Sequence, residues 1–209
     1  MTTEEAGVGR REQNRRRTER ALHEAALACA ERDGYRGATV ARIAEAAGVA
    51  PRTFFRYFAT KDEVMVPGQQ RVRRLVEEAE LPEGDLAPAV RAIADLCERA
   101  LGAAELIPEL EELPRLERLV AGSPELQAAM THHDAQIAEA VTTRLIALLP
   151  QANPLDVHLA GEVVMAMWRT SWDRWRAEAL EVGPTALPLE NFRACRARLA
   201  PVLDALTGR

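Results

Sequence analysis

The chain has 209 residues, of which 47% are apolar and 28% charged, the balance of a soluble globular protein with one large or two small domains. Its longest uninterrupted apolar run, Val163–Trp168, is far shorter than the roughly 20 residues of a membrane-spanning helix. The first residues contain no apolar signal core, so we expect a cytoplasmic protein that does not bind membranes. Three scattered cysteines (Cys29, Cys97 and Cys195) argue against disulfides and a zinc site, and we expect no metal and no cofactor.

The net charge of −5 is distributed unevenly along the chain. Residues 1–61 carry 12 basic and 8 acidic side chains, whereas residues 62–209 carry 15 and 24. A basic first part followed by an acidic body is typical of a protein whose N-terminal domain binds a polyanion. Chance segregation of charge gives the same pattern, so this observation needs support from motifs.

Helical periodicity dominates the sequence, and good helix formers outnumber β-branched residues, so an all-α fold is predicted. A flexible basic arm, residues 1–16, precedes the first helix. Thr39 is a candidate N-cap, Pro51 suits a first helical turn, and Thr60 with Glu63 forms a capping box. The nine expected helices are approximately 17–32, 39–47, 51–58, 60–80, 86–101, 114–121, 123–149, 153–181 and 188–206.

Residues 39–58 predict a helix-turn-helix with a tight turn at Gly48. Their shared apolar core is expected to contain Ile43, Ala44, Ala47, Val49, Phe54 and Phe58. The small alanines allow the two helices to approach closely. A helical hairpin inside any α-helical bundle is the alternative interpretation of this segment taken alone.

The other face of the 51–58 helix carries Arg52, Thr53 and Arg56. An arginine can donate two hydrogen bonds to guanine in the major groove, and a threonine can contact a base or a phosphate. Residues at the helix ends are suited to phosphate contacts, which position a protein without reading sequence. The candidate DNA-binding residues are Thr39, Arg42, Pro51, Arg52, Thr53, Phe55, Arg56, Tyr57 and Lys61.

Three segments carry a family resemblance: TERALHEAALACAERDGY, GATVARIAEAAGV and PRTFFRYFATKDEV. Together they make residues 18–63 similar to the N-terminal domain of TetR-type transcriptional regulators, and Lys61 matches a phosphate-contacting lysine of that family. The resemblance implies a DNA-binding domain over residues 17–63 and a ligand-binding and dimerisation domain over residues 64–209. It further implies a homodimer on a palindromic operator, most simply a repressor that a small molecule releases.

Two departures from the family pattern affect individual contacts. Ala50 stands where a serine usually caps the recognition helix, which removes a cap worth about 1 kcal/mol. Phe55 replaces a frequent tyrosine and therefore lacks its hydroxyl contact to phosphate. More narrowly, RREQNRRRTERALHEAA and the pattern around Pro114 resemble the mycofactocin-associated, acyl-CoA-responsive branch, which implies a long-chain acyl-CoA or similar hydrophobic effector.

A stripe of tryptophans marks the C-terminal part, with Trp168, Trp172 and Trp175 one helical turn apart. It predicts a dimer interface, plain core packing or a ligand wall, and these alternatives remain open. We assign Trp172, Trp175, Phe192, Cys195 and Leu199 to the dimer interface, and Met165, Trp168, Arg115 and Arg118 to ligand binding. For the two arginines, solvated surface is the competing interpretation.

Other functions find less support in the sequence. His132 and His133 are adjacent on a helix and point about 100° apart, which does not suit metal ligation. No phosphate-binding loop, nucleophile elbow or metalloprotease motif is present, so we do not expect an enzyme. A ligand-blind regulator or an activator remains an alternative on the same fold, and a helical interaction protein without DNA binding is a more distant one.

Overall fold

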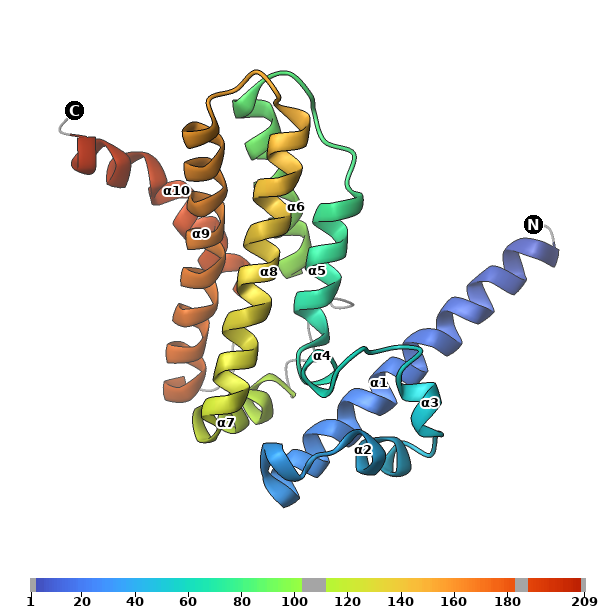
Figure 1. Ribbon diagram of the computed structural model, residues 1–209. Coiled ribbons are helices and arrows are strands. Elements are labelled where there is room, and N and C mark those ends of the chain that lie inside the picture. The colour runs from blue at the N-terminus through green and yellow to red at the C-terminus, as the bar shows by residue number, and fades with distance from the viewer. Residues whose placement is uncertain (1–2, 103–111, 183–187, 208–209) are drawn as a thin grey trace. The chain divides into compact units, whose positions relative to one another are not determined.

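The computed structural model describes residues 3–102, 112–182 and 188–207 (Figure 1). Within these ranges the chain forms ten helices and no strand, which confirms the all-α prediction. None of these helices is long and apolar enough to cross a membrane. The helices are α1 (Thr3–Gly37), α2 (Val40–Ala46), α3 (Pro51–Phe54), α4 (Lys61–Met65), α5 (Pro67–Glu78), α6 (Leu86–Gly102), α7 (Leu113–Gly122), α8 (Pro124–Leu148), α9 (Pro154–Val182) and α10 (Pro188–Thr207).

The chain divides into two compact units. The head unit contains Met1–Pro67 and Arg115–Met130, and the body unit contains Gly68–Pro114 and Thr131–Arg209. The sequence-based division placed its boundary at residue 63 and stays a prediction. The return of Arg115–Met130 to the head unit has no counterpart in the sequence-based division, which assigned all of residues 64–209 to the body.

The head unit has its own apolar core. Side chains of α1 to α4 fill it, together with Leu116 of α7 and Leu126 of α8. The expected helix-turn-helix core lies within it: Ile43, Phe54 and Phe58 are buried, while Ala47 and Val49 pack at its edge. His23 is also buried here, and its Nδ1 lies 2.7 Å from the carbonyl oxygen of Val64. This contact joins α1 to the end of α4.

In the body unit, α9 and α10 pack along each other, and both contact α6. Figure 1 shows α8 and α9 side by side, and Gly161 explains how closely they meet. A Cβ at Gly161 would lie 3.0 Å from the Oγ1 of Thr142 on α8. Because glycine has no Cβ, the two helix backbones can approach at this point.

The helix expected over residues 60–80 is in fact two helices, and Pro67 is the reason. Proline lacks the backbone N–H that would continue the helix, and it disfavours helical geometry at the preceding residue. Val66 accordingly leaves the helical region, with φ −130° and ψ 58°. The helix expected over residues 60–80 is therefore interrupted between α4 and α5.

Two further boundaries differ from the expected ones. Helix α1 begins at Thr3 rather than near Arg17, so most of the expected arm is helical; its flexibility stays a prediction. Gly34, with φ 72° and ψ 163°, ends the regular part of α1 at the expected place. Helix α3 spans only Pro51–Phe54. The backbone then continues to Tyr57 in turns whose hydrogen bonds join residues three apart, as in a 3₁₀ helix.

Candidate nucleic-acid interface

Local sequence features set the geometry of the α2-turn-α3 segment. The Thr39 side chain caps α2 by accepting the Arg42 backbone N–H at 3.4 Å. Gly48 adopts φ 68°, a left-handed conformation that suits glycine, and turns the chain toward α3. Helix α3 begins with Pro51. Ala50 occupies the N-cap position and makes no side-chain cap, because alanine has no side-chain hydrogen-bond acceptor.

Helix α3 and the turn that follows it, residues 51–58, are called the α3 segment below. The two faces of this segment differ in their burial. Phe54 and Phe58 are almost completely buried in the head core. On the other side, Arg52 and Arg56 are exposed, Thr53 is half-buried, and Phe55 is 58% exposed. An exposed phenylalanine between two exposed arginines forms an amphipathic surface of the kind that contacts bases and sugars. The structure therefore brings the expected base-reading residues together on one face.

Arg56 and Tyr57 interact directly at the end of this segment. The Arg56 guanidinium donates a hydrogen bond to the Tyr57 hydroxyl at 3.1 Å and lies 5.1 Å from its ring centroid. This hydrogen bond, together with one involving Thr18 of α1, lowers the pKa of Tyr57. The tyrosine is thus held between the α3 segment and α1.

Lys61 has structural partners in addition to its predicted role. Its Nζ donates to the backbone carbonyl of Tyr35 at 2.9 Å and lies 3.9 Å from the centre of the Tyr35 ring. The Tyr35 hydroxyl hydrogen-bonds the Asp62 carboxylate. Partial burial lowers the pKa of Lys61. These contacts fasten the end of α1 to the start of α4.

Arg42 lies beside a carboxylate at the edge of the same surface. Its Nη1 is 2.9 Å from Asp33, which also binds Arg32 at 2.7 Å. The hydrogen bond from Arg32, with a smaller contribution from Arg42, lowers the pKa of Asp33. A phosphate contact by Arg42 would replace this exposed ion pair, which is worth little in water.

Comparison with known proteins places this segment in a family. Residues 22–66 match the family described as bacterial regulatory proteins, tetR family. The match covers α2, α3, α4 and the part of α1 from Leu22 onward. The helix-turn-helix segment of this chain is therefore that of the TetR family.

A curated transcriptional regulator is similar to about a quarter of this chain. The HTH-type transcriptional regulator TcmR of Streptomyces glaucescens is 50% identical over 58 residues, which are 28% of this chain and 26% of that protein. A solved transcriptional regulator of Pseudomonas aeruginosa PAO1 is 24% identical, with 88% of this chain and 89% of that chain covered and a TM-score of 0.50. A TetR-family regulator of Mesorhizobium loti MAFF303099 is 21% identical, with 90% and 96% covered and a TM-score of 0.48. The Pseudomonas likeness supports the fold alone.

The four residues assigned to ligand binding belong to two different units of the chain. Arg115 belongs to the head unit, where it binds Glu24 and Glu31, and Arg118 is exposed on the same helix. Met165 and Trp168 belong to the body unit and are buried in its core. Arg115 is therefore already engaged by two carboxylates.

Two residues of the interface assignment are buried within the chain itself. Trp175 and Phe192 are 2% and 0% exposed and pack in the body core, and the assignment of an interface stays a prediction. Trp172, Cys195 and Leu199 are partly buried against the same core. The three tryptophans also contact one another. Trp172 lies edge-to-face against both Trp168 and Trp175, with ring centroids 6.2 and 6.0 Å apart.

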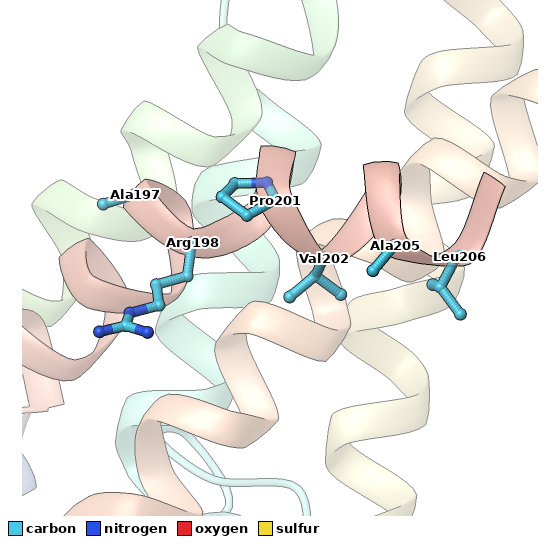
Figure 2. A pocket seen from close by; sticks show the side chains of 6 residues that line it. All are labelled: Ala197, Arg198, Pro201, Val202, Ala205 and Leu206. Atoms are coloured by element: carbon cyan, nitrogen blue, oxygen red, sulfur yellow. The ribbon is translucent and has the colours of Figure 1, made fainter. Parts of the chain in front are cut away.

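Exposed apolar residues that the sequence analysis missed lie elsewhere on α9 and α10. They are Leu155, Leu159, Val202, Leu203 and Leu206. Figure 2 shows an open groove on the last turns of α10, lined by Ala197, Arg198, Pro201, Val202, Ala205 and Leu206. The spacing of Val202 and Leu206, four residues apart, was a signal available in the sequence.

His132 and His133 behave as ordinary polar side chains. His133 Nδ1 lies 3.2 Å from Gln136 Oε1, and His132 Nε2 lies 3.1 Å from Gln136 Nε2. Among the residues that the structure describes, no group of three or more His, Cys, Asp or Glu side chains is arranged to hold a metal ion.

Proposed function

We propose that this chain is a DNA-binding transcriptional regulator that reads an operator through the α3 segment. The observation that carries the proposal is the division of that segment into a buried side, Phe54 and Phe58, and an exposed side with Arg52 and Arg56. A short basic helix anchored by aromatic side chains can enter the major groove while its core contacts hold it rigid. Thr39, Arg42, Tyr57 and Lys61 surround it as phosphate-contacting residues.

Selection of duplexes from a random pool tests this function. The full chain should enrich one sequence, bind it more tightly than unrelated duplexes, and lose affinity steeply as salt increases. Selection without enrichment, together with salt-insensitive binding, would favour a helical interaction protein instead. A palindromic selected site would support binding as a homodimer.

We propose that the dimer forms through the exposed apolar residues of α9 and α10 rather than through the buried tryptophan stripe. Val202 and Leu206 of α10 are 52% and 78% exposed, and Leu155 and Leu159 of α9 are 69% and 61% exposed. Exposed apolar patches on soluble proteins commonly mark interaction sites. Replacing Val202 and Leu206 by aspartate should yield a monomer by light scattering while helix content stays unchanged; a persistent dimer would contradict this surface.

The regulatory role is proposed to be repression that a hydrophobic effector relieves, and a long-chain acyl-CoA is the first candidate because of the sequence resemblance described above. With labelled operator bound to the chain, titration of acyl-CoA should release the DNA in a saturable way, whereas free CoA should not. Release would reflect preferential binding of the effector to the conformation with low operator affinity. Tight operator binding without release would leave a DNA-binding regulator with a different effector or none.

A further inference from the structure

Helix α1 extends well beyond the core that it helps to form. Among its described side chains, burial begins at Glu19 and Leu22, whereas the helix starts at Thr3. At 1.5 Å per residue, the turns before Glu19 form a rod of about 25 Å. Figure 1 shows α1 running past α3 and continuing toward the N-terminus. The segment from Thr3 to Thr18 is called the N-terminal extension below.

The extension and the turn that follows it are strongly basic and almost free of large apolar residues. Between residues 10 and 20 the sequence has two glutamates and the arginines Arg10, Arg11, Arg15, Arg16, Arg17 and Arg20. One of the two acids, Glu19, is largely buried and accepts a hydrogen bond from Arg15 at 3.0 Å. Val8 is the largest apolar side chain of the extension. This composition lacks the apolar face that a partner helix or a lipid interior requires, and it favours a polyanion.

A contact with the α3 segment shows where this basic rod begins. Thr18, the last residue of the extension, hydrogen-bonds the side chain of Tyr57 at the end of that segment. Tyr57 also binds Arg56, one of the proposed DNA-contacting residues. The exposed Arg15, Arg16 and Arg17 therefore lie next to the surface to which DNA binding is assigned. They lie on a helix that the head core fixes at Leu22.

We propose that the N-terminal extension is a second DNA-contacting element, which binds backbone phosphates next to the base pairs read by α3. The proposal rests on the DNA-binding function proposed above. Its length of about 25 Å corresponds to most of one helical turn of duplex, about 34–36 Å. Arginines spaced along such a rod bind phosphates without reading sequence, so the extension should add affinity and salt dependence but little specificity.

The test compares the wild-type chain with Arg16→Ala/Arg17→Ala. Both are measured on the shortest selected duplex that binds and on the same duplex lengthened by about ten base pairs, one helical turn, of unselected sequence on each side. Alanine is the best helix former, so α1 should keep its helix content. Arg91→Ala/Arg99→Ala, which removes two exposed arginines of α6 in the body unit, is the matched control.

Three results are expected if the extension binds DNA. The wild-type chain should bind the longer duplex several-fold more tightly than the shorter one, and the extension variant should lose this advantage. The variant should also show a slope of log affinity against log salt that is smaller by about one unit for each lost phosphate contact. Preference for the selected sequence should persist in the variant, and the α6 control should behave as wild type.

Three outcomes would overturn the proposal, and they are distinguishable. Equal slopes and equal length dependence for the wild-type chain and the extension variant would remove the extension from the interface while leaving operator binding by α3 intact. Absence of DNA binding by the wild-type chain itself would remove the proposed function as well. The same proteins are also tested for binding to anionic phospholipid vesicles. If the extension variant loses vesicle binding while it still binds DNA as the wild-type chain does, the extension belongs to a membrane surface, which equally contradicts the proposal.

Discussion

The guanidinium of Arg115 binds the carboxylate of Glu31 through two parallel hydrogen bonds, from Nε at 2.9 Å and from Nη2 at 2.8 Å. Its Nη1 binds Glu24 at 2.9 Å. One side chain of α7 therefore holds two carboxylates of α1, almost two turns apart. This forked geometry is available to arginine and not to lysine. It gives Arg115 a structural role in the head unit.

Arg115→Ala should lower the free energy of unfolding by about 1 kcal/mol near neutral pH, because partly exposed ion pairs contribute little individually. The hydrogen bonds from Arg115 lower the pKa of Glu31. A carboxyl group whose pKa is lowered on folding stabilises the folded state at pH values above the ordinary pKa of that group. This stabilisation is lost as the pH falls through the lowered pKa of the folded state. The wild-type and variant stabilities, measured by urea denaturation, should therefore converge in acid. Arg118→Ala is the control, and an equal loss there would contradict the role of the fork.

Arg52→Ala and Thr53→Ala should each relax operator preference, by about 1–3 kcal/mol for each lost base contact. The measurement compares affinities for the selected duplex and for duplexes with single substitutions. Because Arg52 is exposed, its replacement should leave the melting temperature nearly unchanged. Unaltered discrimination by Arg52→Ala would remove this residue from base reading.

Lys61→Ala should have two effects. Loss of a phosphate contact should weaken binding to all duplexes alike and reduce the salt slope by about one unit. Loss of the contacts with Tyr35 should lower the melting temperature. Tyr35→Phe separates the two effects, because it removes the hydroxyl that bonds Asp62 but keeps the ring and the lysine charge. It should reduce stability without changing the salt slope, and a reduced slope there would argue against a charge contact by Lys61.

Phe192→Ala should lower the free energy of unfolding by about 3–5 kcal/mol, the usual loss when a buried aromatic side chain is truncated. The loss should not depend on protein concentration if Phe192 packs only within its own chain. If the loss of stability caused by Phe192→Ala grew or shrank as the protein concentration was changed, Phe192 would belong to a dimer interface. Arg99→Ala, at an exposed residue of α6, serves as the control and should change the free energy of unfolding by about 0.5 kcal/mol or less.

The three cysteines should differ in their reactivity toward a thiol reagent. Burial raises the pKa of Cys97 to about 12, so its reactive thiolate is scarce at neutral pH. Cys29 is also buried, while Cys195 is partly exposed. Mass spectrometry after brief labelling of the native chain should find the modification at Cys195 first. Full labelling of all three in urea is the control, and early modification of Cys97 would contradict the packing of α6.

Features determined by neighbouring residues could be predicted from the sequence. The capping box is one: the Glu63 N–H donates to Thr60 Oγ1 at 3.2 Å, and the Glu63 carboxylate accepts the Ala59 N–H at 2.6 Å. The helix-turn-helix is another, because its buried and exposed residues follow helical periodicity. The break at Val66 was also encoded locally, by Pro67, but the long periodic pattern on either side obscured it.

Relationships between distant segments could not be predicted in this way. Glu31 and Arg115 are 84 residues apart, and nothing in the local pattern of either one specifies the other. The tryptophan stripe shows the same limit. Periodicity indicated that one face of α9 is covered, but it did not distinguish α6 and α10 of the same chain from a second copy.

The head unit is assembled from two separate stretches of chain, and this matters for recombination between regulators. Leu116 and Leu126, from beyond residue 100, complete the core around Ile43 and Phe54. A chimaera joined at Val66 would therefore combine a reading domain from one parent with core side chains from the other. Exchange of Met1–Pro67 together with Arg115–Met130 would transplant the whole packed unit. The packing of the head unit therefore depends on two separate stretches of the chain.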